Sequence, residues 1–318
     1  MEYINNNLYT QMEPCAVALG NFDGIHKGHR LLIEEVLKIS KNNNYNSVVF
    51  SFYPHPSHLI KNKDKVGMIY SPQEKRFLLE EMNIDKFIEY PFDKDIATME
   101  ASVFVEEILL GKLNAKTIVV GENFRFGYKR QGDKALLEYL SKNLNFELKV
   151  ISTRIFDGDV ISSSLIRECI KKGEIEQSNS LLGNNYFMIG VIIKGKQLGR
   201  TIGFKTINII PPEGKILPSN GVYITNTLVK GRIYNSITNA GVNPTVSENN
   251  LKIIETHLLD FEDEDIYNEQ VIIYYYKKIR DEFKFSSVEE LRKQILKDKN
   301  AAVKHFEQEG FHAVYGIE

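Results

Sequence analysis

Two histidines three residues apart, His26 and His29, lie in a glycine-rich stretch between a short apolar run and an amphipathic run. On a helical turn, residues at this spacing share one face. Two imidazoles beside a phosphate can donate hydrogen bonds to a transition state that gains negative charge, which is electrostatic catalysis without a covalent nucleophile. A zinc site would need a third ligand, and no His-Glu-x-x-His spacing or nearby cysteine supplies one. A purely structural pair is the other alternative.

The glycines of this stretch, Gly20, Gly24 and Gly28, allow tight turns and close approach of the backbone to a ligand. They fit neither Gly-x-Gly-x-x-Gly nor the P-loop with its Gly-Lys-Ser/Thr end. A helix that starts at the carboxyl end of a parallel strand offers free N–H groups and a partial positive charge. Ligands collect at that edge of an open parallel sheet. The stretch therefore predicts a phosphate site of another type.

The elements that position this site alternate between strands and helices over about the first 180 residues. We expect strands at residues 16–19, 47–52, 87–90 and 117–120, and helices at 29–41, 72–82 and 102–110. Residues 117–120 are all β-branched, which favours a strand. This alternation predicts a doubly wound parallel α/β sheet with helices on both faces.

The pattern changes after Gly183. The runs at 187–193, 222–228 and 271–276 are typical of strands, and clusters of Gly, Pro and Asn separate them. They predict an antiparallel barrel or sandwich. Ser286 or Ser287 can cap a final helix that carries Leu291 and Ile295. We place the boundary at 183–186, with domains at 1–184 and 185–318.

The composition is ordinary for a globular protein, and it argues against several other classes of protein. The 318 residues suit two domains, and 42% hydrophobic with 26% charged residues argues against disorder. The net charge of −2 gives no general electrostatic argument for nucleic acid or an anionic membrane. The two cysteines make no disulfide framework, no apolar run is long enough to span a membrane, and the start lacks signal-peptide features. We expect a cytoplasmic protein.

Motifs in the first half resemble a known family. His26-Lys27-Gly28-His29 resembles the His-x-Gly-His signature of the nucleotidyltransferase superfamily, and the five residues from Gly20 to Gly24 resemble bacterial riboflavin kinase/FAD synthetases. Further blocks follow in that family's order at residues 52–56, 121–127 and 161–167, the last with Ser164 where threonine is usual. This similarity implies a Rossmann-like nucleotidyltransferase domain.

The resemblance implies roles for individual residues. His26 and His29 would be catalytic on the phosphates of ATP. ATP binding is assigned to Gly20, Asn21, Phe22, Asp23, Gly24 and Gly28, and to Ser162, Ser163, Ser164 and Arg167. Contacts to the flavin or its phosphate are assigned to His55, Asn123, Arg125 and Phe126. The alternatives are a plain helix cap for the serines, a surface turn for residues 123–126, and an ordinary loop histidine at 55.

The second half resembles the riboflavin kinase domain of the same family, which is a β-barrel. Gly199, Arg200, Gly203 and Thr206 lie in the matching glycine-rich block and are expected to bind ATP. Thr206 and Asn208 match residues that hold Mg²⁺ and the ATP phosphates, and their hard oxygens suit this metal. Lys205 replaces the family's proline and Ile207 its alanine. Losing the fixed φ of proline is expected to loosen the loop, and the alternative is that Lys205 adds a phosphate contact. The resemblance therefore does not predict the kinase rate or the nucleotide affinity.

Glu255 matches the family's general base, which takes the proton from the ribityl 5′-hydroxyl of riboflavin. A solvated strand glutamate is its alternative. Arg280 is expected to neutralise a nucleotide or FMN phosphate. The tyrosines at 274–276 alternate faces in a strand, so we expect core packing rather than flavin stacking.

Both sets of motifs together predict a bifunctional enzyme that uses ATP with Mg²⁺ to convert riboflavin to FMN and FMN to FAD. Its partners would be these small molecules, without nucleic acid or membrane, and it would be a monomer or weak oligomer. One alternative keeps only the FMN adenylyltransferase, with a weakened barrel that binds flavin. Another is a different nucleotidyltransferase, such as a cytidylyltransferase, which leaves the C-terminal motifs unexplained.

Overall fold

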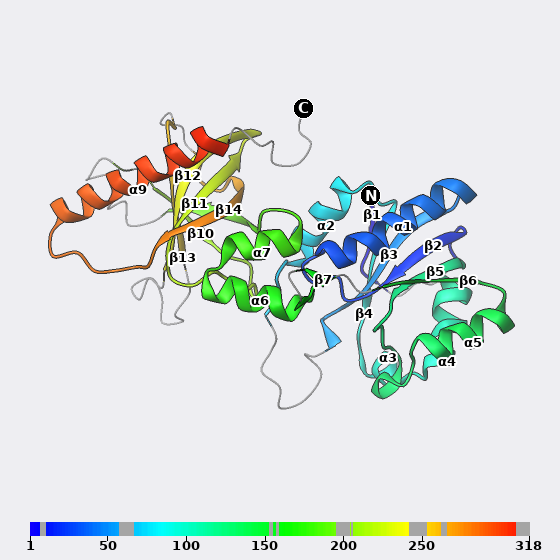
Figure 1. Cartoon of the computed structure of the whole chain (residues 1–318). Helices are drawn as coiled ribbons and strands as arrows, with labels where there is room; N and C mark the ends of the chain where they lie inside the picture. Colours follow the sequence, from blue (N-terminus) through cyan, green and yellow to red (C-terminus); the bar gives the residue numbers. More distant parts are fainter. Residues whose placement is uncertain are drawn as a thin grey trace. The chain divides into compact units, whose positions relative to one another are not determined.

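In the computed structural model the chain forms two compact units. Figure 1 shows the ribbon coloured along the sequence. It describes residues 1–6, 11–56, 67–152, 155–156, 159–194, 204, 206–241, 253–261 and 266–309. The first unit contains Met1–Gly67 and Lys75–Ser162, and the second contains Met68–Glu74 and Ser163–Glu318.

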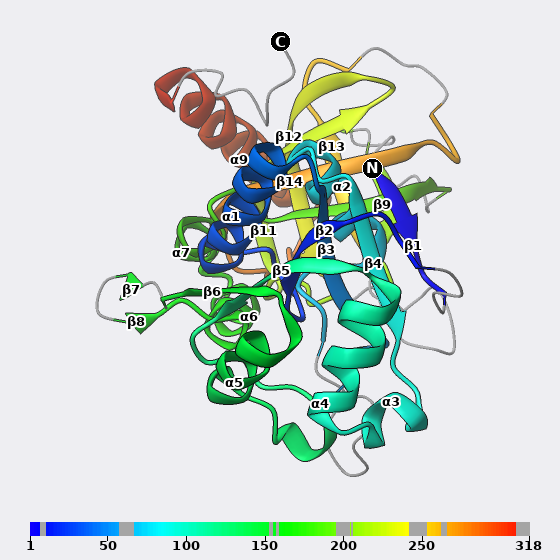
Figure 2. The ribbon, with the colours of Figure 1, turned by 90° about the vertical axis from the view of Figure 1, so that its right-hand side faces the viewer.

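The first unit is built on a six-stranded sheet in which every pairing is parallel. Its strands are β1 (Glu2–Ile4), β2 (Cys15–Leu19), β3 (Asn46–Tyr53), β4 (Lys86–Pro91), β5 (Ala115–Gly121) and β6 (Glu147–Ile151). Their order across the sheet is β1-β4-β3-β2-β5-β6, which can be followed in Figure 2. The predicted parallel α/β fold of the first half is confirmed, with two edge strands, β1 and β6, that the sequence analysis missed.

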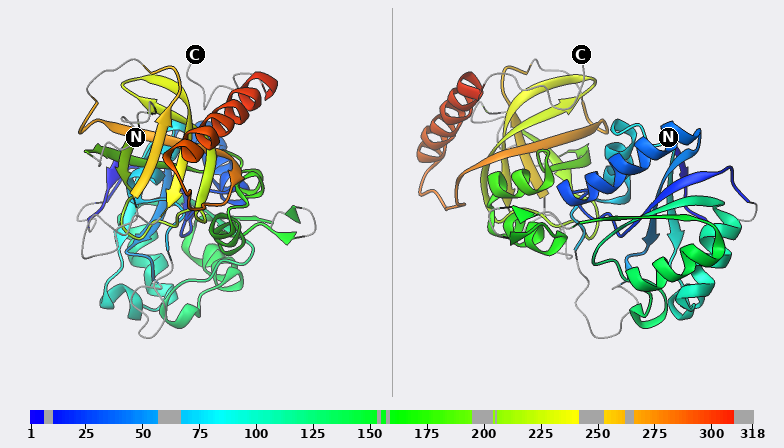
Figure 3. Two further views of the ribbon diagram at one scale, coloured as in Figure 1. Left: turned by 90° about the vertical axis from the view of Figure 1, so that its left-hand side faces the viewer. Right: turned by 45° about the vertical axis from the view of Figure 1, so that its right-hand side comes forward.

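Helices cover both faces of this sheet, as Figure 3 shows for α1 and α5. The helical elements of the unit are α1 (Lys27–Asn43), α2 (Pro72–Glu81) from Lys75 onward, α3 (Lys94–Thr98), α4 (Ala101–Val103), the π-helix η2 (Phe104–Lys112), the 3-10 turn η3 (Tyr128–Arg130) and α5 (Lys134–Leu144). Val17 and Leu19 of β2 belong to the core cluster that also contains Leu137 of α5 and Leu109 of η2. Alternation along the strand turns Ala16 and Ala18 to the opposite face.

The helix expected at 102–110 differs from the prediction. It begins as the single turn α4 and continues as the π-helix η2. Phe104, Val105, Ile108 and Leu109 are all buried along it. The apolar spacing there gives the buried face but does not distinguish an α-helix from the wider π-helical winding.

The second unit contains a closed six-stranded barrel in which every pairing is antiparallel. The barrel strands are β9 (Phe187–Ile193), β10 (Thr206–Ile210), β11 (Gly221–Val229), β12 (Arg232–Gly241), β13 (Ile253–Leu258) and β14 (Gln270–Arg280). Two helices, α6 (Ser163–Lys172) and α7 (Ile175–Leu182), precede the barrel, and α9 (Val288–Glu309) follows it. The barrel with a C-terminal helix is as predicted. A short hairpin of β7 (Ile155–Phe156) and β8 (Asp159–Val160) belongs to the first unit.

The barrel buries hydroxyl groups on one face of its strands and packs α9 against the other. Thr225 and Thr238 have no exposed surface, and their hydroxyls lie 2.8 Å apart. On the opposite face, Ile224 and Ile237 pack with Ala302 of α9. Tyr274 and Tyr275 are also buried, which confirms the core role expected for these tyrosines.

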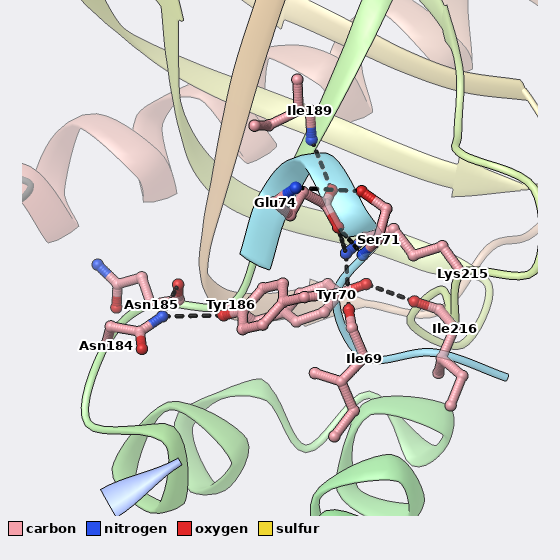
Figure 4. Close-up of polar contacts among 10 residues, drawn as sticks. All are labelled: Ile69, Tyr70, Ser71, Glu74, Asn184, Asn185, Tyr186, Ile189, Lys215 and Ile216. Carbon is pink, nitrogen blue, oxygen red and sulfur yellow. Dashed lines mark hydrogen bonds and ion pairs between the residues drawn. The ribbon is translucent and has the colours of Figure 1, made fainter. Parts of the chain in front are cut away.

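A short piece of the first half of the sequence belongs to the barrel unit. This tether segment, Met68–Glu74, contains the start of α2, where Ser71 caps the helix and Pro72 occupies the first position. The backbone N–H of Ile189 and the ammonium of Lys215 both donate to the Glu74 carboxylate, at 2.8 and 2.7 Å. Figure 4 shows the carboxylate between these two donors.

The Lys215 side chain of this cluster is fully buried. Its Nζ donates to the Ile69 carbonyl at 2.7 Å and lies 4.9 and 4.7 Å from the ring centres of Tyr70 and Tyr186. Figure 4 shows the two rings beside the ammonium. A buried ammonium needs a counter-charge and hydrogen-bond acceptors, and the tether segment supplies both.

The compact units do not follow the predicted boundary at 183–186, because α6, α7 and the tether segment lie in the barrel unit. The functional division into 1–184 and 185–318 stays a prediction. Within the described part of the chain, no helix combines the length and the apolar character that crossing a membrane requires.

Candidate active sites

The two motif histidines lie at the start of α1, directly after the turn that leaves β2. His26 is the N-cap residue, and its Nδ1 accepts a hydrogen bond from the backbone N–H of His29 at 3.3 Å. The two imidazoles are stacked, with ring centres 3.7 Å apart and planes 15° apart. Because Nδ1 of His26 accepts, its neutral ring carries the proton on Nε2, from which it can donate to a ligand.

The turn before α1 holds this pair in place. Phe22 and Ile25 are fully buried and have positive φ angles of 45° and 41°, which is uncommon for residues with a side chain. The Phe22 ring packs against His29 with ring centres 5.1 Å apart. A Cβ at Gly28 would lie 3.2 Å from Nδ1 and Cε1 of His26, so the glycine makes room for the ring. Backbone strain of this kind is concentrated at functional sites.

The pKa of His29 lies well below its ordinary value of 6.5, first because of desolvation and second because of the neighbouring His26. The ring is therefore neutral at physiological pH. Its Nδ1 is buried and has no hydrogen-bond partner among the described residues. A buried polar atom without a partner is unfavourable in the free protein and suits a site completed by a ligand.

The other residues predicted for the first site are distributed as follows. Asn21, Asn123 and Arg125 are exposed, His55 and Ser162 are half-buried, and Asp23, Gly24 and Phe126 are buried. The ring of Phe126 stacks with Phe124 at 5.5 Å in the core of the first unit, and Arg125 pairs with Asp133 at 2.6 Å. Ser163, Ser164 and Arg167 lie in the first turns of α6, as predicted, and belong to the second unit. Their joint role with the histidines remains a prediction.

The kinase candidates lie across neighbouring strands of the barrel. Asn208 of β10 and Glu255 of β13 are directly paired, and Thr206, two residues before Asn208, shares its face of the strand. Asn208 is 8% exposed and Glu255 is half-buried. Gly199, Arg200, Gly203 and Lys205 lie outside the described residues. The structure thus brings Thr206, Asn208 and Glu255 to one face of the barrel.

The oxygen donors on this face fit the Mg²⁺ that the motifs imply. Among the described residues, no group of three or more His, Cys, Asp or Glu side chains is arranged to hold a metal ion. Mg²⁺ is usually held by one or two protein groups together with substrate phosphates and water. The hydroxyl of Thr206, the amide oxygen of Asn208 and one carboxylate match that donor set.

Arg280, the last residue of β14, is bound by a residue of α9. Its Nε and Nη2 donate to the Asp298 carboxylate at 3.1 and 2.9 Å, and Asp298 is 2% exposed. The guanidinium also lies 4.6 Å from the centre of the Phe283 ring. The sequence analysis missed Asp298, because an aspartate on an amphipathic helix carries no local sign of such a partner. The phosphate contact expected of Arg280 remains a prediction.

The folds and sites define a two-domain chain with a nucleotidyltransferase-type sheet and a kinase-type barrel. A family model described as FAD synthetase matches residues 9–165, and one described as riboflavin kinase matches residues 182–306. A bifunctional riboflavin kinase/FMN adenylyltransferase from Haemophilus influenzae is 34% identical over 302 residues, which are 95% of this chain and 97% of that protein. The counterpart from Bacillus subtilis is 34% identical over 294 residues, 91% and 92% of the two chains. The chain belongs to the bifunctional riboflavin kinase/FMN adenylyltransferase family.

A solved structure supports the fold over the same length. The crystal structure of a protein described as a macrolide-efflux protein from Streptococcus pneumoniae matches with a TM-score of 0.84 and 27% identity, and it covers 95% of this chain and 99% of that one. The presence of both domains favours the predicted bifunctional enzyme over an adenylyltransferase with a flavin-binding barrel. It also leaves the cytidylyltransferase alternative without support.

Proposed function

We propose that this chain carries out two consecutive ATP-dependent reactions on flavins. In the first, the 5′-hydroxyl of riboflavin takes the γ-phosphoryl group of ATP, giving FMN and ADP. In the second, FMN takes the adenylyl group of another ATP, giving FAD and pyrophosphate. The observation that carries the proposal is the stacked His26–His29 pair at the N-terminus of α1, in the part of the chain that matches FAD synthetase.

For adenylyl transfer, a phosphate oxygen of FMN attacks the α-phosphorus of ATP, a new P–O bond forms, and the bond between the α-phosphorus and the bridging oxygen breaks. Negative charge grows on the departing pyrophosphate. His26 can donate from Nε2, and the neutral His29 can donate from one ring nitrogen, so the pair stabilises this charge together with the N–H groups at the start of α1. Ser162, Ser163, Ser164 and Arg167 would add further phosphate contacts.

For phosphorylation, Glu255 accepts the proton of the 5′-hydroxyl as its oxygen attacks the γ-phosphorus, and ADP leaves. Asn208 lies opposite Glu255 in the barrel register, which keeps a neutral oxygen ligand beside the general base. Thr206 and Asn208 would hold Mg²⁺, which neutralises phosphate charge when bound. The proposal also includes a cytoplasmic location, where ATP is available, and a monomer or weak oligomer without nucleic-acid or membrane partners.

The test is a time course with purified protein, riboflavin, ATP and Mg²⁺, with the flavins separated by chromatography. The proposal expects FMN to accumulate first and FAD to follow, with one pyrophosphate released per FAD. Riboflavin that stays unchanged would exclude the kinase, and supplied FMN that is not adenylylated would exclude the second reaction. Replacing ATP by CTP should leave FMN unconverted to any dinucleotide.

A further inference from the structure

A row of polar side chains extends across three neighbouring barrel strands. Glu255 of β13 is paired with Asn208 of β10 on one side and with Asn239 of β12 on the other. Residues directly opposite each other in an antiparallel pair face the same side of the sheet, with Cβ atoms about 4.5–5.5 Å apart. Asn208, Glu255 and Asn239 therefore share one face, and Glu255 lies between the two amides.

The hydroxyl contacts of the adjacent residues identify which face this is. Thr238 and Thr256 have no exposed surface, and their hydroxyls lie 2.9 Å apart. The Thr238 hydroxyl also contacts that of Thr225, so these hydroxyls share one buried side of the sheet. Asn239 directly follows Thr238 in the sequence, and Glu255 directly precedes Thr256. Because successive residues of a strand face opposite sides, Asn239 and Glu255 point to the other side. Ile237, two residues before Asn239, packs with Ala302 of α9 on that side. The row lies on the outer face of the barrel.

Asn239 has an unused acceptor in this row. Its Oδ1 is buried and has no hydrogen-bond partner among the described residues. A buried acceptor without a donor is unfavourable, and a hydroxyl of a bound molecule would satisfy it. The phosphates of ATP have no such donor at neutral pH, whereas a polyol chain has several.

We propose that Asn239 binds the ribityl chain of riboflavin, with Oδ1 accepting a hydrogen bond from a ribityl hydroxyl. The order of the row supports this, because the general base must stand beside the accepting 5′-hydroxyl. With the nucleotide and metal on the Asn208 side of Glu255, the flavin chain occupies the Asn239 side. Beyond Asn239 the row continues with Val222 of β11 and then with Arg280 of β14. The inference rests on the proposed kinase function of Glu255.

The experiment compares Asn239→Ala with wild type in steady-state riboflavin phosphorylation. Loss of one neutral hydrogen bond predicts a rise of about 10-fold in the KM for riboflavin, with the KM for ATP within about twofold. Asn235→Ala is the matched control. Asn235 lies on the same strand and face, and its Oδ1 is likewise buried without a partner among the described residues, but it is paired with Asn226 rather than Glu255. Its kinetic constants should match wild type.

Riboflavin analogues that each lack one ribityl hydroxyl give a second readout, in which their binding to wild type and to Asn239→Ala is compared. One analogue should bind wild type about 10-fold more weakly than riboflavin, measured by quenching of flavin fluorescence, and should lose nothing further on Asn239→Ala. Asn239→Asp keeps an acceptor oxygen and should retain riboflavin affinity better than Asn239→Ala.

Three results would overturn the inference: a riboflavin KM unchanged in Asn239→Ala, an equal rise in the ATP KM, or no weakened analogue on wild type. If Asn239→Ala misfolds, Asn239→Leu, which is similar in volume and also lacks the acceptor, takes its place in both experiments. Failure of the proposed function looks different. In that case wild type itself leaves riboflavin unphosphorylated, or Glu255→Gln keeps full kinase activity.

Discussion

The imidazole of His29 stacks on that of His26 at 3.7 Å, while the backbone N–H of His29 donates to His26 Nδ1. The second contact fixes the proton of a neutral His26 on Nε2, and the first disfavours charge on both rings at once. With His29 neutral, the pair places ring N–H donors at a helix N-terminus. Such donors stabilise developing phosphate charge without a proton transfer.

Replacing His29 by alanine removes one donor and the ring that supports His26. We expect the turnover of FMN to FAD to fall by about 10²–10³-fold, the cost typical of a lost transition-state donor. Riboflavin phosphorylation should be unchanged, because His29 lies in the first unit and Glu255 in the second. Both rates are measured on the same preparation, and equal loss of the two with the fold intact would contradict the assignment.

Gly28→Ala separates stability from activity. Gly28 is the second residue of α1 and its φ is not positive, so alanine suits its backbone conformation and the free energy of unfolding should change by less than about 1 kcal/mol. The new Cβ would stand 3.2 Å from the His26 ring and must displace it by a few tenths of an ångström. We expect adenylyl transfer to decrease about 10-fold, since small misplacements of catalytic groups are costly. Unchanged FAD formation would show that the position of the His26 ring does not matter.

The lowered pKa of His29 predicts a specific pH dependence. The unfolded chain binds a proton at this residue near its ordinary pKa of about 6.5, whereas the folded chain does so only at lower pH. The free energy of unfolding therefore decreases as the pH falls below about 6.5, by up to about 1.4 kcal/mol per pH unit. His29→Gln should show a smaller decrease over the same interval, measured by urea unfolding followed by circular dichroism. Histidine NMR signals give a direct check, and a His29 signal that titrates near its ordinary pKa would contradict the neutral ring.

Glu255→Gln keeps the size of the side chain but removes the proton acceptor. We expect riboflavin phosphorylation to fall by about 10²–10⁴-fold, while adenylylation of supplied FMN stays normal. The matched control is Glu269→Gln, which changes a carboxylate that is 45% exposed and pairs only at 4.0 Å with Lys230. Near-normal kinase turnover in Glu255→Gln would remove this residue from its proposed role.

The buried Glu74–Lys215 pair should be essential for the stability of the barrel unit. Lys215→Met leaves the Glu74 carboxylate buried without its counter-charge, which typically costs about 3–5 kcal/mol. Lys277→Met breaks the exposed pair with Glu176, whose side chains are 48% and 65% exposed, and should cost at most about 1 kcal/mol. Urea unfolding of the full chain compares the two. Equal midpoints would show that the buried pair contributes nothing specific.

The spacing of apolar residues along short stretches of the sequence predicted individual strands and helices. The strand expected at residues 117–120 and the helix expected at 29–41 fall in β5 and α1 of the structure. Glu74 and Lys215 are 141 residues apart, and neither carries a local sign of the other. The same holds for Arg280 with Asp298, and for Asn239, whose place beside Glu255 depends on the register of two strands. Contacts of this kind follow from closure of the barrel rather than from any short window of residues.

The most direct test of two separate sites in one chain mixes two variants that each lack one of the two activities. His29→Ala and Glu255→Gln are each incubated with riboflavin, ATP and Mg²⁺, alone and together in equal amounts, and the flavins are separated. We predict that His29→Ala stops at FMN, that Glu255→Gln leaves riboflavin unchanged, and that the mixture forms FAD. No FAD from the mixture, although each variant is folded and keeps its remaining activity, would contradict it.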